Sequence, residues 1–94
     1  MRLDWLPAAE RNVEDQVAYI AARNPKAALA MGDKIEAAVA RLADHPHMGR
    51  PGRLRGTREL VVTGTPYVVV YRVEPAAVVI LRVLHGAQRW PPRL

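Results

Sequence analysis

The sequence contains no cysteine, which excludes disulfide bonds, thiol catalysis and cysteine-ligated zinc sites. It has no apolar run near the roughly 20 residues that a membrane-spanning helix needs, because Arg82 interrupts the longest one, VVILRVL. We also expect no signal peptide, since the start, MRLDWLPAAERN, carries charges where such a peptide is apolar. We therefore expect a cytoplasmic protein without a membrane partner.

Motifs for common cofactors are missing as well. The chain carries no phosphate-binding glycine loop, no nucleophile elbow and no paired-carboxylate motif, so we expect no cofactor. His45 and His47 flank Pro46, but no third ligand lies near them in the sequence, and we expect no metal site. The chain of 94 residues, 50% of them hydrophobic, has the size and composition of a single domain covering residues 1–94.

Charge is divided unevenly along the chain. Residues 1–44 contain six Lys or Arg and seven Asp or Glu, a net charge of −1. Residues 45–94 contain eight Arg against Glu59 and Glu74, a net charge of +6. Arginine stays charged and binds carboxylate or phosphate through two parallel hydrogen bonds. The second half therefore predicts an acidic partner, a nucleic acid or an acidic protein segment, while the plainer alternative is a solvated arginine-rich surface.

Two helices are expected after a short strand at residues 2–5. Pro7 suits the first turn of a helix, and apolar residues recur at helical spacing after it: Ala9, Val13, Val17 and Ile20. Asn24 and Pro25 end this helix and supply the N-cap and the first position of the next one. The second helix also has one apolar face and should end near Asp44.

The second half of the chain predicts a sheet. Residues 45–57, HPHMGRPGRLRGT, form a loop by their glycine and proline content. Three runs rich in β-branched residues follow, and their short separators imply antiparallel hairpins: RELVVT, PYVVVYRV and AVVILRVL. The order β-α-α-β-β-β predicts an α+β fold in which a helical hairpin packs on one face of an antiparallel sheet. The other face is only partly covered, and the polar tail HGAQRWPPRL leaves the sheet.

The register of the last hairpin decides which charged residues meet. If the turn near residues 74–77 has two central residues, Arg72 lies opposite Val79. Arg72 then shares a face with His85, and Arg82 lies on the other face. A change of one residue in the turn length places Arg72 and Arg82 on the same face instead. Both arrangements stay open at the level of the sequence.

The ordered segments resemble one protein superfamily. Trp5 precedes the first helix, and the later segments come in the order YIAARNP, HPHMGRPG, GTRELVV, PYVVVYRV and ILRVLHGAQRWP. This order, at this length and charge, resembles the RelE/ParE superfamily of toxins over nearly the whole chain. The resemblance implies the toxin of a type II toxin–antitoxin (plasmid stabilisation) module, which arrests growth and is neutralised by a cognate antitoxin. It also implies the same β-α-α-β-β-β fold.

Members of this superfamily act on different targets. RelE-like members cleave mRNA on the ribosome, whereas ParE-like members inhibit DNA gyrase and are not known as nucleases. RelE-like nucleases usually carry an arginine in the central strand, where this chain has Val68, and a basic or tyrosine-containing cluster after the last strand, where it has GAQRW. The resemblance is closer to the ParE-like branch and implies a gyrase inhibitor. A ribosome-dependent endoribonuclease, hence an enzyme, is the alternative, and a non-toxic basic nucleic-acid-binding module is a third.

Each mechanism points to different residues. RNA cleavage needs a proton-transfer residue and cations at the phosphate, and the residues that could supply or orient them are His85, Arg72, Arg82, Arg89 and Glu59. For His85, the structural alternative is a strand-end histidine that is hydrogen-bonded to the backbone. Binding of gyrase or antitoxin would instead use the arginine-rich loop and the tail, through Arg50, Arg53, Arg55, Arg58, Arg89 and Trp90. Homodimerisation stays open.

Overall fold

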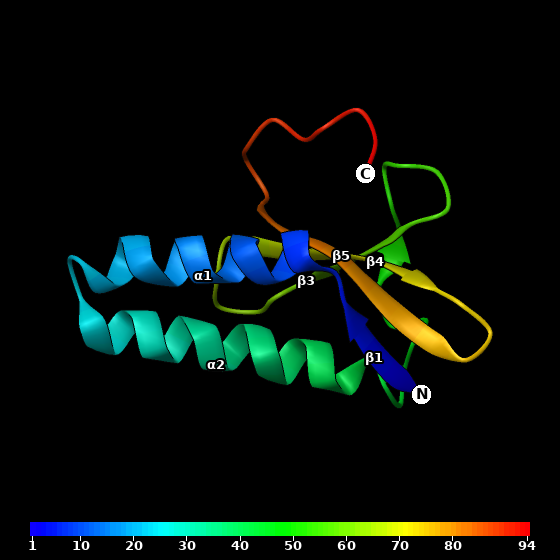
Figure 1. The fold of residues 1–94 in the computed structure, drawn as a ribbon, viewed down its shortest axis with the longest axis horizontal. Helices are drawn as coiled ribbons and strands as arrows, with labels where there is room; N and C mark the ends of the chain where they lie inside the picture. The colour runs from blue at the N-terminus through cyan, green and yellow to red at the C-terminus, as the bar shows by residue number, and fades with distance from the viewer.

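The computed structural model describes residues 1–94 and has two layers (Figure 1). One layer is a hairpin of two helices, α1 (Pro7–Ala21) and α2 (Pro25–Arg41). The other is a five-stranded sheet made of β1 (Arg2–Trp5), β2 (Arg50–Pro51), β3 (Arg58–Val61), β4 (Tyr67–Val73) and β5 (Ala77–His85). The helices cover one face of the sheet, so the predicted α+β fold is confirmed.

The sheet is mixed rather than wholly antiparallel. Its strand order is β1-β5-β4-β3-β2, and β3, β4 and β5 form the predicted antiparallel hairpins. β1 pairs with β5 in parallel, which is possible because two helices, not a tight turn, connect β1 to the rest of the sheet. β2 lies inside the segment that was expected to be entirely loop, and it adds a short edge to β3. On these two points the sequence-based expectation was wrong.

The helix boundaries follow their capping signals. The side chain of Asn24 accepts a hydrogen bond from the backbone N–H of Ala27 at 3.1 Å, and Pro25 opens α2, as predicted. α2 ends at Arg41 rather than near Asp44, because its last turn tightens into i→i−3 bonds such as that from Leu42 N–H to the carbonyl oxygen of residue 39.

Side chains of helix α1 form hydrogen bonds with the backbone of β5 at the edge that β1 leaves unpaired. β1 pairs with β5 only as far as Ile80, which leaves the backbone of Val83 at an open edge. The Val83 N–H donates to Asn12 Oδ1 at 3.1 Å, and Gln16 Nε2 donates to the Val83 carbonyl at 3.0 Å. Because Asn12 and Gln16 are four residues apart, they lie on one face of the helix. These two bonds fix α1 along the strand where β1 stops.

The main core lies between the helices and the sheet. Its twelve buried residues come from both layers: Ala9, Met31, Ile35, Val39, Leu42, Val62, Tyr67, Val69, Tyr71, Val78, Ile80 and Val83. The sheet face that turns away from the helices, called the open face below, carries a smaller aliphatic cluster of Val70, Val79, Leu81 and Leu84. The tail leaves β5 as expected but returns over this cluster through Trp90. No helix has both the length and the apolarity to cross a bilayer.

A β-bulge interrupts the pairing of β4 with β5. Near the turn, Arg72 lies opposite Val79, which is the register of a two-residue turn. Farther along, Val70 lies opposite Arg82, and Leu81 is the extra residue on β5. Two successive residues of a bulged strand can thus lie on the same face, and the alternation of side chains is reset by one position.

The bulge decides which charged side chains share a face. Arg82 is the cross-strand partner of Val70, which belongs to the open-face cluster, so Arg82 lies on the open face together with Arg72. His85 pairs with Tyr67 of the main core and lies on the helix side. Near the turn, the register is the one expected for a two-residue turn, with Arg72 opposite Val79. Even so, Arg72 shares its face with Arg82 and not with His85, as was expected for the other turn length.

Two glycines should respond to alanine with opposite signs. At Gly49 a Cβ atom would lie 2.6 Å from Tyr71 Oη and 2.7 Å from the Glu59 carbonyl oxygen, so Gly49→Ala should lower the free energy of unfolding by about 1–3 kcal/mol. At Gly32, inside α2, the nearest atom would be Val17 Cγ2 at 3.6 Å, so Gly32→Ala should raise it by up to about 1 kcal/mol. Urea unfolding of both variants measures these changes, and a Gly49→Ala protein as stable as the wild type would contradict the close packing.

Candidate functional site

A row of side chains crosses the open face from strand to strand. Pairing sets Arg50 opposite Glu59, Glu59 opposite Val70, and Val70 opposite Arg82. Because directly opposed residues share a face, all four lie on the side away from the helices. Two guanidinium groups and one carboxylate therefore surround an aliphatic centre.

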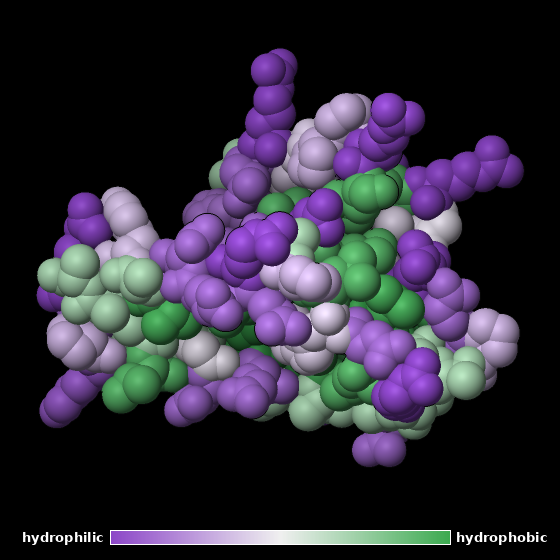
Figure 2. Space-filling model, viewed as in Figure 1, coloured by the Kyte–Doolittle hydropathy of each residue, from purple (hydrophilic) through white to green (hydrophobic).

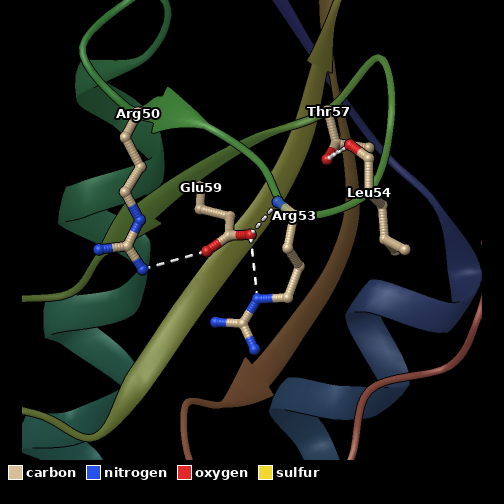
Figure 3. A network of polar contacts seen from close by, with 5 residues as sticks. All are labelled: Arg50, Arg53, Leu54, Thr57 and Glu59. Atoms are coloured by element: carbon tan, nitrogen blue, oxygen red, sulfur yellow. Dashed lines mark hydrogen bonds and ion pairs between the residues drawn. The ribbon is translucent and has the colours of Figure 1, made fainter.

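Glu59 is a buried charged residue, only 3% exposed, at the middle of this row. Its Oε2 accepts hydrogen bonds from the Arg53 backbone N–H at 2.7 Å and from Arg53 Nε at 3.3 Å (Figure 3). Its Oε1 accepts a hydrogen bond from Arg50 Nη2 at 3.1 Å. A buried carboxylate is costly unless it is paired and hydrogen-bonded, and these bonds meet that requirement. They also tie β2 and the loop after it to β3.

The charge of Glu59 is permanent at neutral pH. Burial raises the pKa of its carboxyl group, but the Arg53 N–H and the guanidinium groups of Arg50 and Arg53 outweigh burial and hold the pKa below its usual value of 4.5. A general base works best when its pKa lies near the working pH. Glu59 is therefore suited to hold arginines in place and not to move a proton.

Three of the four arginines in the predicted loop cluster have partners within the fold. Two of them bind the Glu59 carboxylate. Arg58 donates from Nε to the carbonyl oxygen of Gly49 and from Nη2 to that of His47, each at 3.1 Å. These side chains stabilise the loop, so the number of cations overstates how many are free to bind a partner.

Arg55 is the exception. It lies at the tip of a tight loop, closed by a hydrogen bond from the Gly52 N–H to the Thr57 carbonyl at 2.8 Å. Thr57 Oγ1 also donates to the Leu54 carbonyl at 2.6 Å, and Gly56 adopts φ +78°, which favours glycine. The Arg55 side chain is exposed and makes neither an ion pair nor a hydrogen bond. The loop therefore presents one free guanidinium group on a well-ordered backbone.

Trp90 holds the C-terminal segment, residues 86–94, against the open face. Its ring packs on the aliphatic cluster, and the guanidinium carbon of Arg53 lies 3.5 Å from the ring centroid, well within the range of a cation–π interaction. The indole Nε1 is buried and has no hydrogen-bond partner. Glu59 thus orders Arg53, and Arg53 in turn covers Trp90.

The residues considered for RNA cleavage lie on two sides of the sheet. The rings of His85 and Tyr67 meet edge to face at 5.7 Å, and His85 Nδ1 accepts a backbone N–H two residues further along at 3.1 Å. His85 is thus a strand-end histidine that is bonded to the backbone. Arg72 and Arg82 lie on the opposite face with Glu59, and Arg89 is on the C-terminal segment. The structure does not bring the histidine and the strand arginines together.

A groove of about 440 Å³ runs between α1 and α2. Apolar residues line it: Trp5, Val13, Val17, Ala28, Leu29 and Ile35. Four carboxylates and no lysine or arginine complete its lining: Glu10, Glu14, Asp33 and Glu36. Figure 2 shows apolar surface along the seam between the two helices, with hydrophilic residues beside it. Leu29 is 69% exposed, so this apolar surface has no cover within the chain.

This groove was not predicted from the sequence. Glu10 and Glu14 are four residues apart, and Asp33 and Glu36 are three apart, so each pair lies on one face of its helix. That spacing was a usable signal. The missing information was the crossing of the two helices, which turns the two acidic faces toward each other.

His45 and His47 lie in the segment that follows α2. His45 and His47 line a shallow hollow with Arg41 and Met48. No group of three His, Asp or Glu side chains in the chain is arranged to bind a metal ion.

Glu59→Gln should destabilise the protein and reduce its sensitivity to acid. Loss of the charge-assisted hydrogen bonds should lower the free energy of unfolding by about 2 kcal/mol. Because the pKa of Glu59 is lowered in the folded protein, its contribution is full above the usual value of 4.5 and is lost as the pH falls through the folded value. Chemical unfolding at a series of acidic pH values should therefore show a smaller decline for the variant.

The matched control for this prediction is Glu74→Gln. Glu74 pairs with Arg72 at 2.7 Å, but both side chains are more than 40% exposed, so its loss should cost little. Equal destabilisation by the two substitutions would contradict the role given to Glu59.

Comparisons with known proteins agree with this architecture. A family model described as the ParE toxin of the type II toxin–antitoxin system parDE matches residues 3–90. The candidate toxin Y4kP of Sinorhizobium fredii is 42% identical over 90 residues, which cover 96% of this chain and 93% of that protein. Toxin RelE3 of Caulobacter vibrioides is 36% identical over 85 residues, which cover 88% of this chain and 91% of that protein.

Two solved structures share the fold. A chain of the chromosomal ParDE toxin–antitoxin system from P. aeruginosa is 25% identical with a TM-score of 0.82, over 90% of this chain and 95% of that chain. A chain of the RelBE2 toxin–antitoxin complex from Mycobacterium tuberculosis is 25% identical with a TM-score of 0.59, over 93% of this chain and 92% of that chain. The resemblance seen in the sequence is thereby confirmed. This chain belongs to the ParE toxin family of the RelE/ParE superfamily and is the toxin of a type II toxin–antitoxin system.

Proposed function

We propose that this toxin inhibits DNA gyrase by binding it, without catalysing a reaction. The observation that carries the proposal is the separation of His85 from Arg72 and Arg82 by the sheet. A nuclease needs its proton-transfer residue and its phosphate-binding cations around one scissile bond. A binding toxin needs contact area and complementary charge, which exposed arginines such as Arg55 can provide.

Two further observations support this reading. Val68 stands where RelE-like nucleases carry an arginine; it is 5% exposed and pairs with Leu84 of the open face. The matching family model is that of ParE toxins, and the ParDE structure superposes better than the RelBE2 structure, with TM-scores of 0.82 and 0.59. A toxin of this kind acts in the cytoplasm, where gyrase works, and its module stabilises the plasmid that carries the genes.

The second candidate function is ribosome-dependent cleavage of mRNA. The 36% identity with toxin RelE3 and the net charge of +6 on residues 45–94 favour it. In that case the open face, with Arg72 and Arg82, would meet the RNA. A group other than His85 would then have to move the proton. Membership of a toxin family argues against the third alternative, a non-toxic nucleic-acid-binding module.

The proposed partner that neutralises this toxin is a cognate antitoxin with an amphipathic helix in the groove between α1 and α2. The apolar floor of the groove suits the apolar face of such a helix, as in other helix-in-groove complexes. The rim carboxylates, which no lysine or arginine of this chain neutralises there, suit basic residues on its flanks. We therefore expect the antitoxin helix to be apolar on one face and basic on its flanks.

Substitutions should separate the two toxic mechanisms. Expression of the chain alone should arrest growth, and co-expression of the neighbouring antitoxin gene should restore it.

His85→Ala should leave the arrest intact, because a gyrase inhibitor needs no proton transfer. Arg55→Ala should weaken target binding by about 1–2 kcal/mol, because the proposal places this exposed guanidinium at the interface. The combined Arg53→Ala and Arg55→Ala change should reduce toxicity further, with an added loss of stability from Arg53.

The measurement is a gyrase supercoiling assay run beside a ribosome-dependent mRNA cleavage assay, with thermal melts of each variant. Arg41→Ala, on the last turn of α2, serves as the matched control for the arginine changes. A folded His85→Ala protein that loses toxicity, together with arginine variants that keep it, would favour the nuclease and reject the gyrase proposal.

Two adjacent acidic residues of α1 test the antitoxin groove. Glu14 lines the groove, whereas Asp15 is exposed on the same helix and lies outside it. Glu14→Lys should therefore weaken antitoxin binding about tenfold, or about 1.4 kcal/mol, and Asp15→Lys should leave it nearly unchanged. Calorimetric titration of the purified pair gives both values. If the two variants bind equally well, the helix does not occupy this groove.

A further inference from the structure

The far end of the C-terminal segment packs on the fold without hydrogen bonds, mainly through Trp90. Its first residues are hydrogen-bonded: the Gly86 N–H donates to the Pro66 carbonyl at 2.8 Å, and the Gln88 N–H donates to the His85 carbonyl at 3.0 Å. From Arg89 to the end, no hydrogen bond joins the segment to the rest of the chain. The contacts that hold this part in place are the packing of Trp90 on the aliphatic cluster and under Arg53, and Pro91 beside it is also partly buried.

The C-terminal segment is positively charged and covers a face that is itself positively charged. It contributes Arg89 and Arg93 and no acidic side chain. The face that it covers already carries Arg50, Arg53 and Arg82 against the single carboxylate of Glu59. Like charges brought together on one surface repel each other.

The hydrogen bonding of the segment is also incomplete. The indole Nε1 of Trp90 is buried without an acceptor, and a buried unsatisfied donor disfavours the state that contains it. Arg82 donates at 2.7 Å to the Leu81 carbonyl and has no carboxylate partner. Displacement of the segment would free the indole Nε1 to bond to water, and an acidic segment would give Arg82 the carboxylate that the chain's own segment lacks.

We propose that this part of the open face is a docking surface for an acidic and apolar segment of a partner protein, which displaces the chain's own C-terminal segment. An apolar side chain of the partner takes the place of Trp90 on the floor of Val70, Val79, Leu81 and Leu84. Its carboxylates bind Arg53 and Arg82. The surface lies across the sheet from the groove between the helices, and the proposal does not depend on whether gyrase or mRNA is the target.

A nucleic acid fits this surface less well than an acidic protein segment. Phosphates would bind the guanidinium groups, but a phosphate backbone has no apolar group for the floor. Bases usually stack on aromatic side chains, and the floor below Trp90 contains only valine and leucine. The combination of an aliphatic floor and flanking arginines therefore favours a protein segment that alternates acidic and apolar residues.

Tryptophan fluorescence tests the displacement directly. The Trp5→Phe variant leaves Trp90 as the only tryptophan of the chain. Titration with a peptide of about twelve residues that alternates glutamate and leucine should shift its emission to longer wavelength and saturate, because the ring leaves an apolar surface. A lysine–leucine peptide and a single-stranded RNA of similar length should not do so. No shift with the acidic peptide, or an equal shift with the RNA, would overturn the proposal.

Binding affinities provide an independent test with matched controls. Trp90→Ala should bind the labelled acidic peptide about tenfold more tightly than the wild type, because the segment no longer competes for the face. Trp5→Phe should not. Arg82→Gln should weaken binding about fivefold by removing a charge-assisted hydrogen bond, whereas Arg41→Gln, at the end of α2, should not. Equal affinity of Trp90→Ala and wild type, or of the two arginine variants, in proteins with unchanged melting curves would overturn the proposal.

Discussion

The buried carboxylate of Glu59 organises the cationic side of this molecule. Its hydrogen bonds join β2 to β3, fix the backbone at Arg53 and orient the Arg53 guanidinium over Trp90. Because the bonds that accompany burial keep the pKa of Glu59 low, this anchor stays charged at neutral pH. The loop that carries Arg55 is therefore held in one conformation before any partner binds. Because the loop is already ordered in the free protein, binding loses less conformational entropy.

The bulge at Leu81 has a comparable effect on the sheet. Without the extra residue, strict alternation would place Arg72 on one face and Arg82 on the other. With it, both arginines lie on the open face, and His85 is left on the helix side beside Tyr67. One inserted residue thus places both strand arginines on one face of the sheet and His85 on the other. This local irregularity favours a binding toxin more than the overall fold does, because toxins with different targets share the fold.

Most of the fold could be predicted because its signals are local. Asn24 and Pro25 mark a helix boundary, and β-branched runs mark the strands. The parallel pairing of β1, the bulge and the groove could not be predicted, because each depends on contacts between distant segments. The candidate site shows the same limit. Counting charges found the arginines of the loop, but only the structure separates Arg55, which is free, from the three whose partners are Glu59 and backbone carbonyls.

The two proposed surfaces make different demands on an antitoxin. The groove between the helices is lined by carboxylates, and the open face across the sheet is lined by arginines. A helix confined to the groove would leave Arg55 and the C-terminal segment accessible to a target. The molecule measures 40 × 28 × 23 Å, and an extended chain advances about 3.3 Å per residue, so roughly nine residues span its middle dimension. An antitoxin that covers both surfaces therefore needs a basic amphipathic helix and an acidic extended segment in the same chain, joined around the edge of the sheet.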